Sequence, residues 1–352
     1  MQKLEDSLRY RTLGKTGMKV TSVAFGCMIT SDASVIERAA DLGINYFDTA
    51  RVYQGGNNER MVGAALKSRR QKVYISTKSG GRTKEAALTD LDTSLRTLGT
   101  DYVDIWYLHG KTHASDLVPE LLEAQEIAKK AGKIRFAGFS THGGFEDVIP
   151  AGIALKHFDV ILTSYNFTMG SSIDKILDDA KAAGIGMVAM KVMAGGFRTA
   201  KAGTRQYDVL KRDGAFLSAL KWVLRTPRID TAIPSMTDSD QLDQNVTAMT
   251  SQYGSTDEKL LAAQLRHVGP LVCRGCGGCE GVCSKGLPTS DLVRFAMYAD
   301  GYGQFALGRE RFLELPDEQR AVRCSDCSTC PIRCPNGVDV VGRVARAQEL
   351  FG

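Results

Sequence analysis

The sequence predicts an α/β protein, a (β/α)8 barrel followed by a small second domain. Three features of its 352 residues support this prediction. Short β-branched runs alternate with amphipathic segments along most of the chain, the length exceeds that of a usual single domain, and eight of the nine cysteines lie beyond residue 270. We therefore expect the barrel in residues 1–265 and the cysteine-rich domain in residues 266–352.

Eight strand candidates follow one another at regular intervals. They are Val23–Gly26, Tyr46–Asp48, Val73–Lys78, Val103–His109, Arg135–Ser140, Val160–Tyr165, Met187–Met190 and Thr231–Pro234. Turn residues at Gly14 and Gly17 indicate a short hairpin before them. Segments with helical spacing lie between the strands, at Val35–Leu42, Glu59–Ser68, Glu85–Leu98, Val118–Lys130, Ile173–Ala183, Ala215–Leu224 and Asp240–Met249. Parallel strands joined by helices in this way predict a closed TIM barrel of about 250 residues.

Polar side chains stand where these strands end. Asp48, Lys78, His109 and Ser140 close four successive strands, and Tyr53 lies in the loop after the first of them. Because active sites of such barrels gather at the carboxyl ends of the strands, we expect these side chains to meet.

Together, four of these residues suit the reduction of a carbonyl group. A phenol with a pKa near 10 is too weak an acid for this reaction unless a neighbour assists it. The ammonium of Lys78 favours the phenolate of Tyr53, and a buried Asp48 keeps that lysine charged. His109 can orient the carbonyl oxygen. Each residue alone is more often structural, but four at successive strand ends favour a catalytic interpretation.

The motifs around these residues resemble the aldo-keto reductase family over roughly residues 9–265. They are NYFDTARVYQGGNNE (45–59), ISTK (75–78), YLHG (107–110), GFSTH (138–142) and AIPSMTDSDQLDQN (232–245). The resemblance implies an oxidoreductase that interconverts a small-molecule carbonyl and an alcohol with a nicotinamide cofactor. It also implies that Tyr53 is the proton donor, that Lys78 and Asp48 tune it, that His109 orients the carbonyl, and that Ser140 holds the nicotinamide amide.

The stretch after the last strand bears on the choice between NAD and NADP. Many members of the family hold the NADP phosphate with a Lys-Ser pair after the proline of this strand and with an arginine a few residues later. Here Pro234 is followed by Ser235 and Met236, and Gln241 stands in place of the arginine. The missing cations favour NAD over NADP, although we expect Pro234, Ser235 and Gln241 still to contact the cofactor. Asn245 matches the family's asparagine on the adenine side.

Two further positions are expected to contact the cofactor. Asn166 follows the sixth strand, and Lys191 lies in MKVMAGG (190–196), which is similar to the iron-sulfur branch of the family. The glycines of this segment either let a cofactor or anion approach or simply form a tight turn. Leu162 and Met190 replace the glutamine and the aromatic residue that usually hold the nicotinamide.

Two cysteine runs predict iron-sulfur clusters. CRGCGGCEGVC (273–283) and CSDCSTCPIRCP (324–335) both have the spacing C-x2-C-x2-C-x3-C. In bacterial ferredoxins three cysteines of such a run bind one 4Fe-4S cluster and the fourth binds the other. The domain is therefore expected to be ferredoxin-like, α+β or helical, with two 4Fe-4S clusters. The ligand sets would be Cys273, Cys276, Cys279 and Cys334 for one cluster, and Cys283, Cys324, Cys327 and Cys330 for the other. Zinc, the competing metal, does not account for a four-cysteine run.

Composition excludes several other classes of function. The net charge is +5 and no basic run is interleaved with aromatic residues, which argues against nucleic-acid binding. No apolar stretch reaches the roughly 20 residues of a membrane helix, and the N-terminus has no signal-peptide core. We expect a cytoplasmic protein without membrane partners.

The combination of a nicotinamide site and clusters leaves the role of the clusters open. A nicotinamide transfers two electrons as hydride, whereas each cluster transfers one. The clusters could relay electrons from an external ferredoxin or other electron carrier, stabilise the fold, or sense redox state. The alternative function is a redox sensor or electron carrier whose barrel binds a dinucleotide without turnover.

Overall fold

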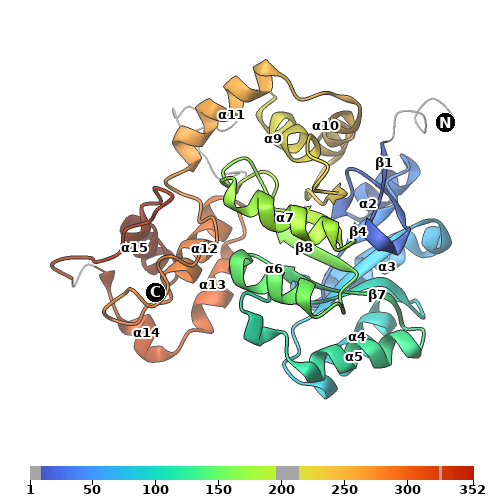
Figure 1. Ribbon diagram of the computed structural model, residues 1–352, viewed down its shortest axis with the longest axis horizontal. Helices are drawn as coiled ribbons and strands as arrows, with labels where there is room; N and C mark the ends of the chain where they lie inside the picture. The colour runs from blue at the N-terminus through green and yellow to red at the C-terminus, as the bar shows by residue number, and fades with distance from the viewer. Residues whose placement is uncertain (1–8, 196–213, 325–326) are drawn as a thin grey trace. The chain divides into compact units, whose positions relative to one another are not determined.

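The computed structural model describes residues 9–195, 214–324 and 327–352. The chain divides into two compact units (Figure 1). We call Met1–Asn166, Gly170–Val192 and Leu220–Tyr253 the barrel unit, and Phe167–Met169, Met193–Ala219 and Gly254–Gly352 the C-terminal unit. The boundary expected at residue 265 stays a prediction.

The barrel unit begins with the expected hairpin, in which β1 (Tyr10–Thr12) pairs antiparallel with β2 (Lys19–Thr21). Eight parallel strands follow: β3 (Phe25–Gly26), β4 (Tyr46–Asp48), β5 (Tyr74–Ser79), β6 (Val103–Leu108), β7 (Ile134–Thr141), β8 (Val160–Ser164), β9 (Gly186–Met190) and β10 (Thr231–Ala232). Each pairs with its neighbours in chain order. The sheet closes because the amides of Ala24 and Gly26 donate to the carbonyls of Ala232 and Pro234, at 2.8 and 3.0 Å. The predicted (β/α)8 barrel is confirmed.

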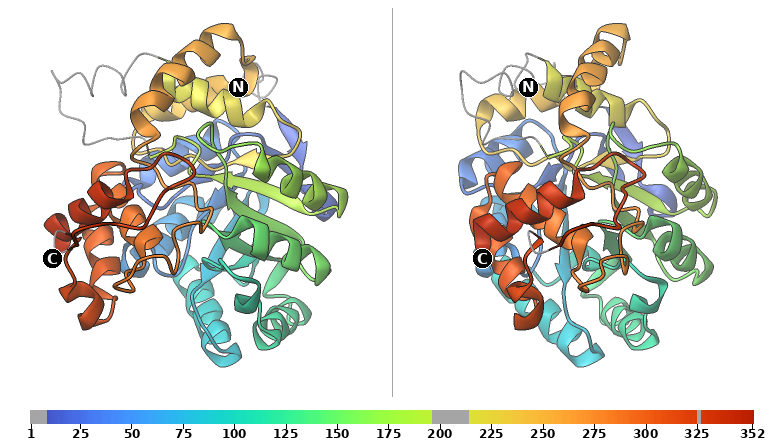
Figure 2. Two further views of the ribbon diagram at one scale, coloured as in Figure 1. Left: turned by 60° about the vertical axis from the view of Figure 1, so that its left-hand side comes forward. Right: turned by 90° about the vertical axis from the view of Figure 1, so that its left-hand side faces the viewer.

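Helices surround these strands (Figure 2). They are α2 (Ala33–Asp41), α3 (Asn57–Leu66), α4 (Lys84–Leu98), α5 (Pro119–Lys130), α6 (Phe145–Ala154), α7 (Ser172–Ala182), α9 (Ala215–Leu224), which crosses the division between the units, and α10 (Ser239–Thr250). Short 3-10 helices are η1 (Gly14–Thr16), η2 (Tyr53–Gly56), η3 (Lys67–Lys72) and η4 (Ala114–Asp116). The sequence analysis named no segment for α6. Its sequence FEDVIPAGIA is strongly apolar and contains Pro150, which disfavours the interior of a helix.

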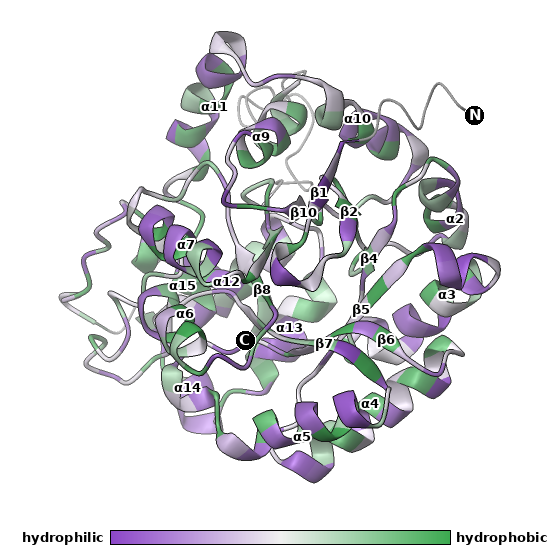
Figure 3. Ribbon diagram, turned by 45° about the vertical axis from the view of Figure 1, so that its right-hand side comes forward, coloured by the Kyte–Doolittle hydropathy of each residue, from purple (hydrophilic) through white to green (hydrophobic). Residues whose placement is uncertain are grey.

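Residues that alternate along the strands fill the barrel interior. One buried cluster contains Leu13, Met18, Val20, Ala24, Tyr46, Ile105, Tyr107, Val160, Leu162, Val188, Met190 and Ile233. Figure 3 shows the strand β8 mostly in apolar colours and the outer helices α4 and α5 in mixed ones. Side chains two residues apart on a strand share a face, so Asp48 follows the interior residue Tyr46 on the same face, nearer the carboxyl end of the barrel.

The C-terminal unit is helical in the part that the structure describes. Its helices are α11 (Ser255–Val268), α12 (Thr289–Asp300), α13 (Phe305–Leu313), α14 (Asp317–Ala321) and α15 (Val340–Phe351). Residues of α12 and α15, such as Val293 and Val344, form its core, and six of the eight clustered cysteines pack against that core. Among the described residues, no helix is both long and apolar enough to span a bilayer.

Candidate functional site

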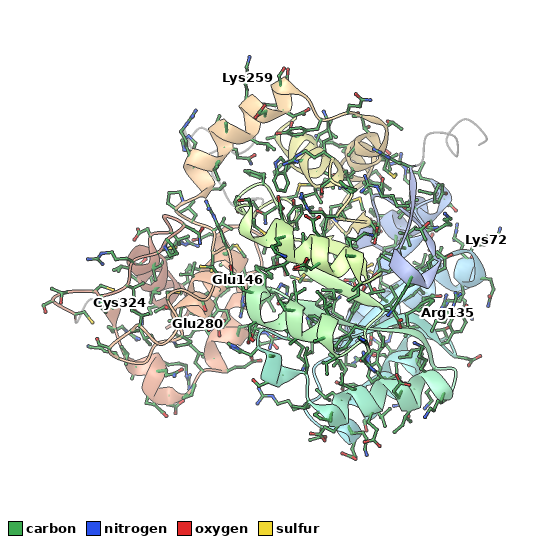
Figure 4. The ribbon with its side chains drawn as sticks, viewed as in Figure 1. Lys72, Arg135, Glu146, Lys259, Glu280 and Cys324 are labelled. Carbon is green, nitrogen blue, oxygen red and sulfur yellow. The ribbon has the colours of Figure 1, made fainter. Side chains whose placement is uncertain are left out.

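The carboxyl ends of the strands form one side of the barrel unit. Lys72 and Arg135 stand at the amino ends of β5 and β7, whereas Glu146 follows the carboxyl end of β7. Figure 4 shows Lys72 and Arg135 on the opposite side of the barrel unit from Glu146. The residues predicted to be catalytic belong to the side of Glu146, because each lies at or just beyond the carboxyl end of its strand.

Asp48 and Lys78 form a buried ion pair at this end. Strand register sets Asp48 of β4 beside Ser76 of β5, whose next residue on the same face is Lys78. The Nζ of Lys78 donates to Asp48 Oδ2 at 2.5 Å and to the carbonyl of Thr49 at 2.7 Å. Ser76 Oγ donates to Asp48 Oδ1 at 2.7 Å. Both charged side chains are almost fully buried, so water does not weaken their attraction.

Tyr53 and His109 lie next to this pair. The Nζ of Lys78 lies 4.8 Å from the centroid of the Tyr53 ring and is hydrogen-bonded to its side chain. The rings of Tyr53 and His109 meet edge to face with their centroids 6.0 Å apart. The structure thus brings together all four residues that were predicted to act together.

The electrostatics favour a charged lysine. Burial lowers the pKa of Lys78, but the nearby Asp48 carboxylate and the Tyr53 side chain raise it by more, and the net pKa lies above the ordinary value. A permanently charged ammonium therefore faces the phenol of Tyr53.

The loop that carries Tyr53 is fixed by residues that the sequence did not single out. Glu59 is fully buried, forms an ion pair with Arg51, and accepts a hydrogen bond from Thr77 Oγ1 at 2.6 Å. Gln54 has a left-handed φ of 53° and donates from its side chain to the carbonyl of Thr30 at 2.8 Å. Glu59 lies in the first turn of α3, and these contacts account for its burial there.

Hydrogen-bonded hydroxyl groups extend from Asp48 into the barrel interior. The hydroxyl of Tyr46 donates to Ser76 Oγ at 2.9 Å and lies 3.0 Å from the hydroxyl of Tyr107. Cys27 is fully buried, and burial raises the pKa of its thiol, so it is a neutral core residue. This set connects Asp48 to the packed interior of the barrel.

Residues predicted to contact the nicotinamide lie at adjacent strand ends. Ser140 is the second-to-last residue of β7, and its buried Oγ accepts from the amide of Gly110 at 2.9 Å. Asn166 follows β8 and donates to the carbonyl of Lys191 at 3.1 Å, where Lys191 has a left-handed φ of 57°. Within the described residues, the buried hydroxyl of Ser164 has no hydrogen-bond partner. It lies on the same face of β8 as the interior residue Leu162, so a bound group at the barrel mouth could satisfy it.

The segment after β10 ends at a capped helix. Pro234 is buried, Ser235 is partly exposed, and Asn245 is buried on α10. Asp238 Oδ1 accepts from the amide of Gln241 at 2.9 Å, and the side chain of Gln241 contacts the other carboxylate oxygen. The amino end of α10 thus carries a negative side chain.

In the C-terminal unit, the cysteines fall into the two expected sets. Cys273, Cys276, Cys279 and Cys334 line one cavity together with Val293, Pro335 and Asn336. Burial raises the pKa of Cys279, and Cys276 and Cys334 raise it further as neighbouring thiolates. In the other set, burial raises the pKa of Cys324, and Cys283, Cys327 and Cys330 add to the effect. Each set therefore has its four sulfurs close enough to influence one another.

Among the described residues no three His, Cys, Asp or Glu side chains converge closely enough to hold one metal ion. A 4Fe-4S cubane separates its four thiolate ligands more than a zinc ion does, so the donor sets fit a cubane better.

Two family models match the chain. The model described as the Aldo/keto reductase family matches residues 29–214, just over half of the chain. The model described as a 4Fe-4S dicluster domain matches residues 272–338, which include all eight clustered cysteines.

Similar proteins agree with the first of these models. L-galactose dehydrogenase of Arabidopsis thaliana is 28% identical over 69% of this chain and 88% of its own length. The structure of aldo-keto reductase AKR11C1 from Bacillus halodurans, in its holo form, has a TM-score of 0.63 at 27% identity and covers 76% of this chain and 98% of its own. The structure of a Klebsiella pneumoniae aldo/keto reductase in complex with NADP and acetate has a TM-score of 0.60 at 23% identity. It covers 73% of this chain and 94% of its own, and it shows the shared fold.

Proposed function

Because the chain belongs to the aldo/keto reductase family and carries a 4Fe-4S domain, we propose that it interconverts a carbonyl and an alcohol with a nicotinamide cofactor at Tyr53. The observation that supports this most strongly is the buried ammonium of Lys78, which contacts both Asp48 and Tyr53. Burying a charged lysine costs free energy because it loses its hydration. The stabilisation of the Tyr53 phenolate gives this buried charge a function.

In the proposed mechanism each residue has one role. The nicotinamide supplies the hydride when bound. The hydroxyl of Tyr53 gives its proton to the carbonyl oxygen as negative charge develops there, and it takes the proton back in the reverse direction. Lys78 stabilises the phenolate that remains, and Asp48 keeps Lys78 charged. His109 directs the carbonyl oxygen toward Tyr53 and shares its charge.

We assign the cofactor to the ends of β7–β10. Ser140 and Asn166 would hold the nicotinamide amide, and the unpartnered hydroxyl of Ser164 supports a bound polar group beside them. Lys191, Pro234, Ser235 and Asn245 would contact the rest of the dinucleotide. NAD is favoured over NADP, since the Asp238 carboxylate and Gln241 occupy the amino end of α10, where a 2′-phosphate would need cations.

We further propose that the cysteine sets hold two 4Fe-4S clusters, one on Cys273, Cys276, Cys279 and Cys334 and the other on Cys283, Cys324, Cys327 and Cys330. Two observations support these assignments. The first set lines one cavity, and in the second set Cys283, Cys327 and Cys330 raise the pKa of Cys324. Two clusters suit the transfer of single electrons with an external carrier better than a purely structural role.

Turnover with a panel of aldehydes and ketones tests the proposed catalytic site. We expect NADH-dependent reduction under anaerobic conditions and a loss of about 100- to 10,000-fold in kcat for Tyr53→Phe. Tyr74→Phe, at the opposite end of β5, is the matched control and should leave kcat unchanged. Dinucleotide binding with no turnover, equal for wild type and Tyr53→Phe, would favour the redox-sensor alternative.

Stopped-flow absorbance tests the role of the clusters. If they exchange electrons, a low-potential ferredoxin reduced by dithionite should bleach them within the time of one turnover. Clusters that stay oxidised while the carbonyl is turned over at the full rate would assign them a structural role.

A further inference from the structure

Two cationic side chains stand together at the carboxyl end of the barrel, beside the proposed catalytic residues. Arg82 lies in the loop between β5 and α4, four residues after Lys78. Lys111 lies just after β6, two residues beyond His109, and its amide donates to the carbonyl of Ser140 at 2.8 Å. The loops adjoin because β5 pairs with β6 and the amide of His109 donates to the carbonyl of Ser79 at 2.9 Å.

Neither cation is neutralised. In the described part of the chain, no carboxylate lies within ion-pair distance of Arg82 or Lys111. Lys111 is nevertheless half-buried. Burial lowers the pKa of its ammonium, Asp116 raises it in part, and the charge of Arg82 lowers it again. An ammonium that is partly dehydrated and lies near a second cation is unfavourable unless a negative group joins it.

The nearest acidic group is already engaged. Asp116 Oδ2 accepts hydrogen bonds from the amides of Thr112 and His113, at 2.8 and 3.0 Å. It therefore acts as the cap of η4, and it reaches Lys111 only through longer-range attraction.

Two other cations of the neighbouring loops have ion-pair partners of their own. They are Arg51, which pairs with Glu59, and Lys84, which pairs with Glu123. Among the described residues, Arg82 and Lys111 are thus without an ion-pair partner at this sector of the barrel mouth, next to the residues proposed to handle the carbonyl.

We propose that Arg82 and Lys111 bind an oxyanion of the substrate, so that the substrates of this barrel are aldehydes or ketones that carry a carboxylate or a phosphate. This inference rests on the proposed function, since it assigns the substrate class to the same site. Both side chains suit an oxyanion, because the guanidinium binds it through two parallel hydrogen bonds and the ammonium adds a point charge.

Matched pairs of substrates test the proposal. One arm compares 4-oxobutanoate with butanal, and the other compares glyceraldehyde 3-phosphate with glyceraldehyde. We expect wild type to prefer the anionic member of at least one pair in kcat/KM, and the arm with the larger preference identifies carboxylate or phosphate. In Lys111→Met and Arg82→Gln this preference should fall about 10- to 100-fold, the range for a lost charge-assisted hydrogen bond. Lys72→Met, an exposed lysine at the opposite end of the barrel, should keep the preference and the rate.

Calorimetric binding of 4-oxobutanoate and of glyceraldehyde 3-phosphate separates the two proposals. Anion binding that weakens in Lys111→Met, in a protein without turnover, would support the oxyanion site and contradict the proposed reaction. Efficient reduction of butanal and glyceraldehyde, with no preference for the anions and no effect of either variant, would overturn the oxyanion site and leave the reaction standing.

Discussion

The Asp48–Lys78 pair shows how a single buried charge depends on its partner. In the native chain the pKa of Lys78 is raised, with burial lowering it and Asp48 and Tyr53 more than compensating. For a lysine, a raised pKa means that the stabilisation is present throughout neutral pH and is lost only as pH rises through the native-state pKa, above its usual value near 10.4.

Removing Asp48 should therefore act on both activity and stability. In Asp48→Asn the carboxylate that opposes the effect of burial is gone, so the pKa of Lys78 falls. As pH rises, carbonyl reduction should therefore begin to decline at a lower pH than in wild type. The unpaired buried ammonium should also cost about 3–5 kcal/mol of unfolding free energy. The pH profile of kcat/KM and thermal denaturation measure these effects.

Ser76→Ala is the control for this variant. It removes one hydrogen bond to Asp48 but leaves the ion pair, so its pH profile should stay close to that of wild type. An Asp48→Asn profile identical to the wild-type profile would contradict the role assigned to the pair.

At the scale of single residues, the place of a side chain in the barrel could be predicted where its position in the repeating strand pattern is known. Asp48, Lys78 and His109 could be placed because each lies within one residue of the carboxyl end of its strand, and parallel strands end on one side. Glu59 could not, because its burial and its contacts with Arg51 and Thr77 arise from the packing of the α3 amino end against β5. An acidic residue at the start of a helix normally faces solvent.

At the scale of elements, closure of the barrel depends on close contact between its first and last strands. A Cβ added to Gly26 of β3 would lie 2.6 Å from the carbonyl oxygen of Ile233, which is backbone and has little room to move. The barrel closes at this point through the amide of Gly26 itself, which donates to the carbonyl of Pro234.

Gly26→Ala should thus destabilise the barrel by about 1–3 kcal/mol, as expected for overpacking. Gly80→Ala is the matched control, since a Cβ there meets no atom within 4 Å and the backbone conformation is ordinary. Urea denaturation of the two variants measures the difference. Equal midpoints for Gly26→Ala and wild type would show that the first and last strands can separate without cost.

The sequence predicted elements well where their hydrophobic pattern was clear. Seven barrel helices were placed within one or two residues of their observed bounds, but α6 was missed. It contains Pro150, a residue that usually ends or kinks a helix, yet the helix continues through it to Ala154. Tertiary packing stabilises this helix, since Val148 and Ile149 are fully buried.

At the scale of the whole molecule, eight of the nine cysteines are proposed to bind metal. Two cubanes carry four irons each, so the anaerobically prepared protein should hold about eight irons per chain. Cys276→Ser, which changes one ligand of the first set, should reduce this number toward about four. Colorimetric iron and sulfide assays measure it.

Cys27→Ala provides the control, because Cys27 is buried in the barrel unit and belongs to neither set. It should retain the full iron content. Loss of all iron in Cys276→Ser would show that the clusters do not assemble independently, and full retention would contradict the ligand assignment.

The two-part organisation could be predicted at this scale because both parts have a characteristic spacing of residues. Eight alternating strands indicate the barrel, and two four-cysteine runs indicate the clusters. The grouping of Cys334 with the first run and Cys283 with the second followed from ferredoxin spacing, and the lined cavity and the mutual effects of the thiols agree with it.

The most direct test of the proposed reaction is to follow deuterium from C4 of labelled NADH into the product alcohol. We predict that the wild-type protein places one deuterium on the carbinol carbon of its substrate and that Tyr53→Phe does so at least about 100-fold more slowly. Labelled NADH that binds but passes no deuterium to any carbonyl, or that passes it equally fast in both proteins, would contradict hydride transfer assisted by Tyr53.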